Sequence, residues 1–382
     1  MMDEFSLLLP RRVYAGFSSL GHIDGIIKET GASKVAIFTD KGIEKAGLVD
    51  IVLKNILAEY RIFDDLPAEP TYLEAQALVD EAGAYGADLI IAVGGGSVMD
   101  TAKLASLLQG GQIRVKDLLD SPLIAKKRVR TLMIPTTAGT GAEATLNAIV
   151  AVPEQKLKVG IVNPEMMSDY VILDPEMIRK LPMKISASTG VDALCHAIEC
   201  YTGNKANYFS DIFALEALSL IMNNIEKAVK DPDAMDAKVK MQIASFYAGI
   251  AITSSGTTAV HALSYPLGGR YHIAHGVSNA ILLVPVMKFN EDAISSRLAS
   301  GYDRCYGHSD LSEKEKSRAM IERMEEIVKS LEIPSNLATF NVGLGDLDDL
   351  VEAGMKVTRL LNNNMKTVTR EDARRIYSQI LC

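Results

Sequence analysis

The chain has 382 residues, 48% of them hydrophobic, and a formal net charge of −8 at pH 7. This length is enough for two or three domains, and the acidic balance without a basic cluster argues against nucleic acid as a partner. No run approaches the roughly 18 apolar residues that span a bilayer, and the first residues lack the pattern of a signal peptide. We therefore expect a cytoplasmic protein with no membrane partner.

The first half of the chain alternates short apolar runs with stretches of helical periodicity. The apolar runs are rich in Val and Ile and are bounded by Gly, Asp or Pro; they predict strands at 34–39, 60–63, 89–93, 131–135 and 170–173. Helices are expected between them, for example at 72–84 and 97–108. This alternation predicts an α/β domain with a doubly wound, mostly parallel sheet.

From about Ile185 the pattern changes to a succession of helices without strand signals. The helical periodicities lie at 190–201, 210–229, 236–252, 313–331 and 347–358. The second half is therefore predicted to be an all-α domain. We expect the junction at Leu181-Pro182-Met183-Lys184, which gives an α/β domain of residues 1–183 and a helical domain of residues 184–382.

The predicted strand at 89–93 runs into Gly94-Gly95-Gly96-Ser97, and a helix follows. Glycines let a ligand approach the backbone closely, and the free N–H groups of a helix start favour an anion such as a pyrophosphate. Ser97 and Asp100 also form a pattern like a capping box, so a capped helix after a tight turn is the alternative interpretation. The usual dinucleotide fingerprint is absent, because the best acidic residue, Asp40, ends an earlier strand.

A second polar loop follows the predicted strand at 131–135. Its sequence is Thr136-Thr137-Ala138-Gly139-Thr140-Gly141-Ala142-Glu143. Hydroxyls and backbone groups after a strand can donate to a phosphate or a ribose, although Thr and Gly also make ordinary turns. Two such loops at the carboxyl ends of strands in one sheet favour a bound ligand.

The most informative residues are one aspartate and three of the six histidines. Asp192 and His196 are four residues apart, which brings them to one face of a helix. His261 and His275 are expected on a later helix and its following loop. A carboxylate with three imidazoles suits a divalent metal such as Fe2+ or Zn2+. His196 alone would be interpreted as a packed core residue, but a carboxylate among apolar residues needs a partner, and Asp192 therefore favours the metal.

Together and in this order, the motifs closely resemble the iron-containing (group III) alcohol dehydrogenases over nearly the whole chain. The residues that carry the resemblance are 94–103, 135–143, Asp174-Pro175, 192–196 and 261–276. The resemblance implies a dehydroquinate synthase-like two-domain architecture, with a cleft between a nucleotide-binding α/β domain and a helical domain. It also implies a homodimer or a higher homo-oligomer.

The resemblance further implies a set of site residues. The implied ligands of a catalytic metal, usually iron, are Asp192, His196, His261 and His275. The implied contacts to NAD are Asp40, Gly95, Gly96, Ser97, Asp100, Thr136, Thr137, Thr140 and Lys158.

Two of these positions bear on specificity and catalysis. Asp40 matches the position that faces the adenosine ribose in family members that prefer NAD, because a carboxylate accepts from the 2′-hydroxyl and repels a 2′-phosphate. Without the resemblance, Asp40 is equally a turn residue at a strand end. Tyr265 stands where many members have a further histidine, and it is the candidate catalytic residue. A phenol can bond substrate or relay a proton through water, but it is no base at neutral pH unless its pKa is strongly shifted.

The expected activity is metal-dependent, NAD(H)-linked hydride transfer between a small aliphatic alcohol, diol or hydroxy acid and its aldehyde. The stretch from Ala262 to Pro266 looks like that of 4-hydroxybutyrate dehydrogenases, so this acid is a candidate substrate. A glycerol dehydrogenase-like polyol oxidoreductase and a dehydroquinate synthase relative are alternatives, but those enzymes generally use three protein ligands. A metal-stabilised protein without activity is a third alternative, against which the metal motif and the cofactor loop argue together.

Overall fold

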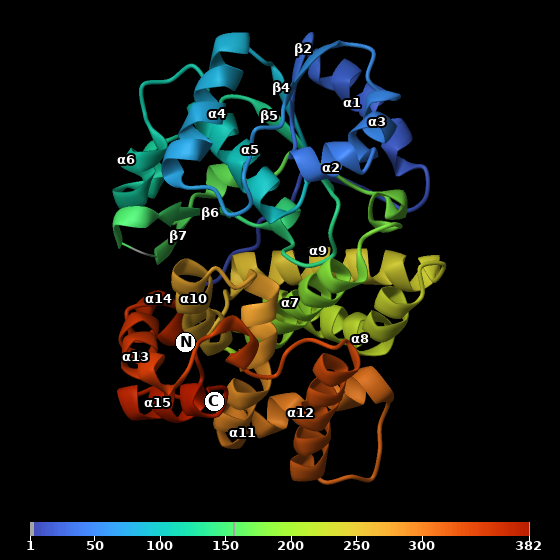
Figure 1. The fold of residues 1–382 in the computed structure, drawn as a ribbon. Helices are drawn as coiled ribbons and strands as arrows, with labels where there is room; N and C mark the ends of the chain where they lie inside the picture. Colours follow the sequence, from blue (N-terminus) through green and yellow to red (C-terminus); the bar gives the residue numbers. More distant parts are fainter. Residues whose placement is uncertain (1–3, 156, 382) are drawn as a thin grey trace. The chain divides into compact units, whose positions relative to one another are not determined.

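The computed structural model describes residues 4–155 and 157–381, which form two compact units (Figure 1). The α/β unit holds Leu8–Thr137 and Gly141–Leu181. The helical unit holds the chain from Pro182 onward, together with residues 4–7 and the short segment Ala138–Thr140. None of the helices in the described residues combines the length and the apolar character needed to span a lipid bilayer.

The α/β unit is built on a parallel sheet of strand order β1-β8-β5-β4-β2-β3. Its strands are β1 Arg12–Ala15, β2 Lys34–Phe38, β3 Glu59–Phe63, β4 Leu89–Gly94, β5 Arg130–Pro135 and β8 Tyr170–Leu173. Its helices are α1 Ile23–Thr30, α2 Lys41–Lys45, α3 Leu48–Leu53, α4 Tyr72–Tyr85, α5 Gly96–Leu108 and α6 Val115–Asp120. Helices α4 and α5 lie on one side of the strands, and α1 and α3 lie on the other (Figure 1). Every residue of β4 is buried, as expected for a central strand covered on both faces.

The five predicted strands are all present, each within one residue of its expected ends. Sequence analysis missed β1 and an antiparallel hairpin of β6 Asn147–Val152 and β7 Leu157–Val162. The edge strand β1 is mostly exposed and carries no apolar run. The hairpin turn begins at Pro153 and lacks the Asn-Gly or Asp-Gly pair that signals a tight hairpin.

The helical unit contains no strand among the described residues, which confirms the all-α prediction. Its helices are α7 Met183–Thr202, α8 Tyr208–Lys230, α9 Met235–Ser254, α10 Ala259–Tyr271, α11 His275–Tyr306, α12 Glu313–Ser330, α13 Leu347–Met355, α14 Thr358–Leu361 and α15 Arg370–Ser378. Sequence analysis did not delimit α10 and α11. Both contain an internal proline, and α10 is buried nearly all round at its start, so neither shows an uninterrupted amphipathic pattern.

A buried ion pair ties α5 to the segment that enters β6. The ammonium of Lys103, whose side chain is 0% exposed, lies 3.2 Å from Oδ1 of Asp100. It also donates to Oγ1 of Thr145 and to the carbonyl oxygen of Asn147, both at 2.9 Å. Oδ2 of Asp100 accepts from the backbone N–H of Ile149 at 3.0 Å. Burial raises the pKa of Asp100 and lowers the pKa of Lys103, so each charge depends on these partners.

We predict that Lys103→Met destabilises the protein, because Asp100 would keep a buried charge without its cation. The expected loss is about 3–5 kcal/mol in the free energy of unfolding, measured by urea titration of the secondary-structure signal. The double variant Lys103→Met/Asp100→Asn should recover a large part of the loss, since it removes both charges. A single variant as stable as the wild type would show that the pair does not support the fold.

Candidate metal centre and nucleotide pocket

Asp192, His196, His261 and His275 converge within the helical unit. One donor atom from each lies within 4.8 Å of the others. Oδ1 of Asp192 is 3.7 Å from Nε2 of His261 and of His275, and 3.9 Å from Nε2 of His196. Donors bound tetrahedrally to one ion at ~2.1 Å lie roughly 3.4 Å apart, so this set fits a divalent metal with only a small contraction.

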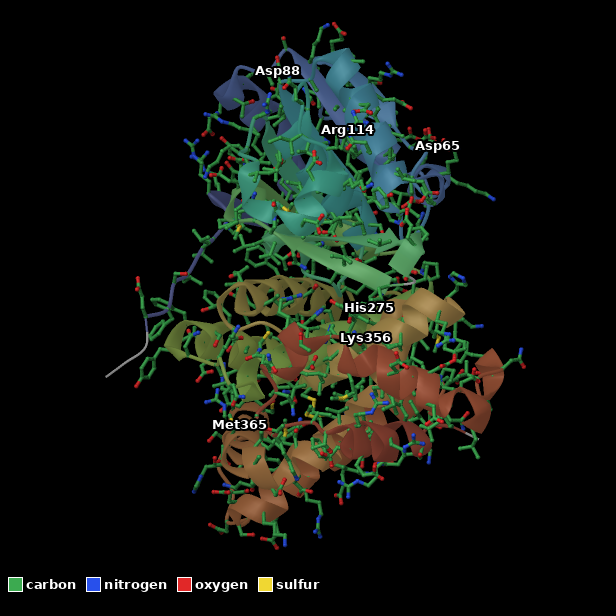
Figure 2. The ribbon with its side chains drawn as sticks, turned by 90° about the vertical axis from the view of Figure 1, so that its left-hand side faces the viewer. Asp65, Asp88, Arg114, His275, Lys356 and Met365 are labelled. Carbon is green, nitrogen blue, oxygen red and sulfur yellow. The ribbon has the colours of Figure 1, made fainter. Side chains whose placement is uncertain are left out.

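Three helices supply the four donors. Asp192 and His196 share one face of α7, and His261 lies in the first turn of α10. His275 was expected in a loop, but it is the first residue of α11. Its side chain is labelled in Figure 2. The start of α11 approaches α7 so closely that a Cβ on Gly276 would lie 2.3 Å from the carbonyl oxygen of Ser188. Glycine at 276 is therefore required to bring His275 to the other donors.

The second ring nitrogens of two histidines are already engaged. Nδ1 of His196 lies 3.3 Å from the carbonyl oxygen of Gly139, and Nδ1 of His261 contacts Oε2 of Glu199. Carbonyl and carboxylate oxygens accept hydrogen bonds, so each Nδ1 is the protonated atom. The Nε2 lone pairs of both rings are then left for a metal.

The charges around Asp192 and His261 suit a cationic occupant. Burial alone would raise the pKa of Asp192, but the three neighbouring imidazoles bring it well below its usual range, so the side chain is a carboxylate. Burial alone would lower the pKa of His261, but Glu199 and Asp192 raise it to about 9. Without a metal the ring therefore carries a second proton on Nε2, and a metal bound at Nε2 would replace that proton. Burial lowers the pKa of His196. Two carboxylates thus stabilise positive charge at this point of the helical unit.

Asn279 belongs to the same cluster, and sequence analysis missed it. Its Nδ2 is 2.7 Å from Oδ1 of Asp192, 3.1 Å from Nε2 of His261 and 3.2 Å from Nε2 of His275. Its Oδ1 is buried and has no hydrogen-bond partner in the described part of the chain. The available signal was its position four residues after His275, which puts both side chains on one face of α11.

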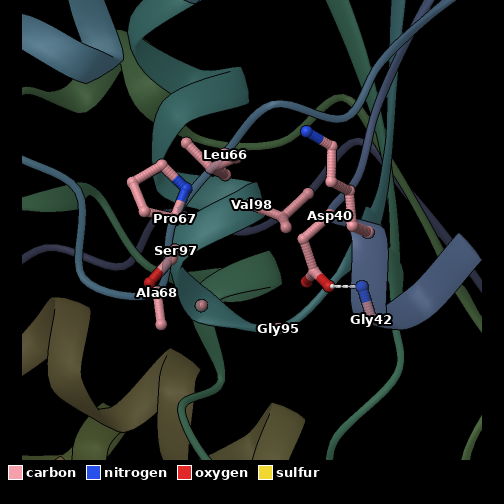
Figure 3. Close-up of a pocket in the computed structure, with 10 residues that line it drawn as sticks. Asp40, Gly42, Leu66, Pro67, Ala68, Gly95, Ser97 and Val98 are labelled. Carbon is pink, nitrogen blue, oxygen red and sulfur yellow. Dashed lines mark hydrogen bonds between the residues drawn. The ribbon is translucent and has the colours of Figure 1, made fainter.

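The α/β unit contains a cavity of about 310 Å³ at the ends of β2 and β4 (Figure 3). Asp40 and Gly42 border it on one side, and Pro67, Ala68 and Ser97 border it on the other (Figure 3). Gly95 and Gly96 also line it, so the glycine loop and Asp40 are brought together.

Asp40 has two functions available to its carboxylate. Oδ1 caps α2 by accepting from the backbone N–H groups of Gly42 at 2.8 Å and Ile43 at 3.0 Å. Oδ2 accepts no hydrogen bond from the described residues and remains available to a ligand in the cavity. The two interpretations from the sequence, a turn residue and a ribose contact, are therefore compatible.

The capping-box interpretation of Ser97 and Asp100 is wrong. Helix α5 has Gly95 as its N-cap, so Ser97 lies inside the first turn, and its Oγ accepts from the backbone N–H of Glu69 at 3.3 Å. Asp100 does not line the cavity, because its carboxylate is held by Lys103 and Ile149. The prediction of a capping box was wrong because α5 begins at Gly96, one residue before the predicted start, with Gly95 as its N-cap.

The remaining predicted residues lie on two segments. The backbone N–H of Thr136 donates to the carbonyl oxygen of Gly94 at 3.0 Å, which joins the two loops. Oγ1 of Thr136 is buried and has no partner in the described residues. Thr137 adjoins Gly95, whereas Thr140 belongs to the helical unit. Lys158, on β7, forms an ion pair with Glu69 at 2.6 Å.

Comparison with known proteins identifies the class. The family model described as iron-containing alcohol dehydrogenase matches residues 10–175, and that of the Fe-containing alcohol dehydrogenase family, C-terminal, matches residues 186–381. Together they cover nearly the whole chain, so the protein is an oxidoreductase of the alcohol dehydrogenase class. The chain belongs to the iron-containing alcohol dehydrogenase family.

Individual relatives are similar to this chain over all or nearly all of their own lengths. Long-chain-alcohol dehydrogenase 1 of Geobacillus thermodenitrificans (strain NG80-2) is 34% identical over 98% of this chain and 96% of the relative. The NAD-dependent methanol dehydrogenase of Bacillus methanolicus is 30% identical over 98% of this chain and 100% of the relative. A crystal structure of a 1,3-propanediol oxidoreductase has a TM-score of 0.92 at 27% identity and covers 99% of this chain and 100% of its own. The predicted family and fold class are confirmed.

We predict that His275→Ala weakens metal binding by at least ~100-fold, because even partners outside the ligand set contribute ~10–100-fold. The measurement is the dissociation constant for Zn2+ in competition with a chelator. His272→Asn is the matched control, since His272 is exposed, three residues away, and in a left-handed conformation that asparagine tolerates. Equal affinity of both variants would remove His275 from the ligand set.

Proposed function

We propose that the protein is a divalent-metal-dependent, NAD(H)-linked dehydrogenase that interconverts a small aliphatic alcohol, diol or hydroxy acid and its aldehyde. The convergence of Asp192, His196, His261 and His275 carries the proposal. Iron is the metal we propose, in line with the family, and the donor set also suits zinc. Relatives named for methanol and 1,3-propanediol support a small alcohol.

In the oxidation direction, alcohol and NAD+ give aldehyde, NADH and a proton. When bound, the metal supplies a Lewis acid that polarises the substrate oxygen. Asp192 contributes a permanent negative charge to its site, and the contacts at Nδ1 hold the rings of His196 and His261 in orientation. His275 is the most accessible of the four, with 32% of its side chain exposed against 3–7% for the others, so the substrate approaches from its side.

We assign the dinucleotide to residues 1–183 and the metal to residues 184–382. Gly95, Gly96 and Ser97 at the start of α5 suit the pyrophosphate, because a helix start offers free N–H groups. Asp40 suits the adenosine ribose. Thr136, Thr137, Thr140 and Lys158 are assigned to the rest of the cofactor, and the buried, unpartnered Oγ1 of Thr136 supports this role. Asp100, which was also predicted to contact NAD, would support the pyrophosphate site by anchoring α5 through Lys103 and Ile149.

We assign Tyr265 to the substrate pocket rather than to proton transfer. It lies on α10 one turn after His261, half-buried, with its ring centroid 6.1 Å from that of His275. A phenol with an ordinary pKa of ~10 is a poor base at neutral pH, so Tyr265 would contact and orient the substrate and would not take up its hydroxyl proton.

The test is a substrate screen with metal-reconstituted protein. NADH absorbance is followed with NAD+ and a series of primary alcohols, 1,3-propanediol, 4-hydroxybutyrate and glycerol, and the aldehydes are tested with NADH. We expect turnover that a chelator abolishes and Fe2+ restores. A strong preference for 4-hydroxybutyrate would favour the hydroxy acid, and a preference for glycerol would favour the polyol alternative. No turnover in either direction with bound metal would refute the proposal.

The proposal includes a cytoplasmic location and a homodimer or higher homo-oligomer. The family resemblance supports the assembly. The three cysteines described in the structure are all free thiols, which is typical of a reducing compartment. Cell fractionation and light scattering of the purified protein test the two points separately.

We predict a preference for NAD over NADP that Asp40→Gly relaxes, because the variant no longer repels a 2′-phosphate. The ratio of kcat/KM for NADP to that for NAD should rise about tenfold, equivalent to about 1.4 kcal/mol. Glycine is a tolerated N-cap, so α2 should persist. Asp65→Gly is the control, since Asp65 is exposed and does not line the cavity. A wild type that uses NADP better than NAD would overturn the role of Asp40.

We predict that Tyr265→Phe changes KM and substrate choice, while kcat and its pH profile stay close to those of the wild type. Tyr271→Phe, on the same helix, is the control, because its hydroxyl donates to Asp346 at 2.9 Å. A fall in kcat of ~100-fold for Tyr265→Phe, the scale of lost acid–base catalysis, would instead make Tyr265 part of the proton transfer.

A further inference from the structure

Glu199 is a fully buried carboxylate that takes no part in the four-donor set. It lies on α7 three residues after His196, and its side chain is 0% exposed. A buried carboxylate without partners would be strongly destabilising. The hydrogen-bond partners of Glu199 therefore indicate its role in the structure.

The first oxygen of Glu199 caps α10. Oε1 accepts from the backbone N–H groups of Thr258 and Val260, both at 2.9 Å, and from the hydroxyl of Thr258 at 2.7 Å. Thr258 is the N-cap residue of α10, but its own side chain makes no capping hydrogen bond. A carboxylate from another helix thus satisfies the N–H groups that a helix start leaves free, and its charge complements the helix dipole.

The second oxygen of Glu199 holds the imidazole that the same helix carries. Oε2 contacts Nδ1 of His261. One side chain therefore fixes both the position of the first turn of α10 and the ring of His261 within that turn. Because the acceptor is a carboxylate, the proton of the neutral ring lies on Nδ1, and the lone pair lies on Nε2. Nε2 is 3.7 Å from Oδ1 of Asp192 and 3.1 Å from Nδ2 of Asn279, within the four-donor cluster.

We propose that Glu199 is the positioning residue of the metal centre, which sets both the place and the tautomer of His261 by binding the start of α10 and Nδ1 of the ring together. The inference rests on the proposed metal centre. Asp192, His196 and Glu199 lie on neighbouring turns of α7, so this helix presents two ligands and fixes a third one on α10.

Glutamine at position 199 cannot replace the carboxylate, although it has nearly the same shape. Both Glu199 oxygens accept hydrogen bonds, whereas an amide has one acceptor oxygen and one NH2 donor. If the amide oxygen faces Thr258 and Val260, the NH2 group faces Nδ1 and favours the tautomer with Nε2 protonated. If the amide is turned round, the start of α10 loses its acceptor instead.

The experiment compares Glu199→Gln with Asp372→Asn in the full-length protein. Asp372 is the matched control, because its carboxylate also accepts hydrogen bonds at the start of a helix. It lies on α15 and accepts from the backbone N–H and the hydroxyl of Thr369, the N-cap residue of that helix. The first measurement is the dissociation constant for Zn2+ in competition with a chelator, and the second is the urea unfolding of the metal-free protein. We expect Zn2+ binding ~10–100-fold weaker in Glu199→Gln and unchanged in Asp372→Asn.

The outcomes separate the inference from the proposal on which it rests. Wild-type protein that binds no Zn2+, Co2+ or Fe2+ would refute the metal centre itself. A wild type that binds Zn2+ and a Glu199→Gln variant of equal affinity would refute the positioning role alone. A weakened affinity that Asp372→Asn shares at similar loss of stability would show a general effect of helix capping, and would also overturn the role.

If Glu199→Gln does not fold, NMR of the wild-type protein tests the same inference. In the Zn2+-loaded wild type labelled with 15N-histidine, His261 should show an exchange-protected proton on Nδ1 and no proton on Nε2. The resonance is assigned by its absence in His261→Asn. An unprotonated Nδ1 on His261 would overturn the inference.

Discussion

A helix that is buried on all sides can carry ionisable groups only if every one of them has a partner. In α7 every residue from Gly190 to Thr202 is buried, and the segment includes Asp192, His196 and Glu199. Asp192 meets three imidazoles and Asn279, His196 meets the carbonyl oxygen of Gly139, and Glu199 meets the start of α10. The partners that these three side chains require hold the first turns of α10 and α11 against α7, and this arrangement forms the four-donor cluster.

The α/β unit meets the same constraint beneath its glycine loop. Lys103 and Asp100 anchor α5 to the chain that enters β6, while burial raises the pKa of nearby Glu143 to about 7. The buried polar atoms that have no hydrogen-bond partner among the described residues include Oγ1 of Thr136 in this unit and Oδ1 of Asn279 in the other. Both lie where the sequence placed a cofactor or metal. Since unpaired buried polar groups are rare, they fit sites built to receive a further group.

Secondary structure was predictable where burial leaves a simple pattern. Central parallel strands such as β4 appear as short runs of Val, Ile and Leu, and α8, α9 and α12 appear as long helical periodicities. Prediction failed where packing overrides pattern. The strand β1 is held by pairing with β8 and not by its own apolar residues, and α10 and α11 continue through prolines because the surrounding helices hold them. The start of α5 also shifted by one residue, because glycine needs no capping side chain.

The sequence by itself identified the four donor residues and the glycine loop that follows β4. A spacing of four puts Asp192 and His196 on one helix face in any fold, and glycines after a buried strand leave N–H groups free at a helix start. Only the tertiary structure decided which residues orient those donors. Glu199 and His261 are 62 residues apart, and Gly139 and His196 are 57 apart. No local rule relates residues at such separations, because their contact depends on how whole helices and loops pack.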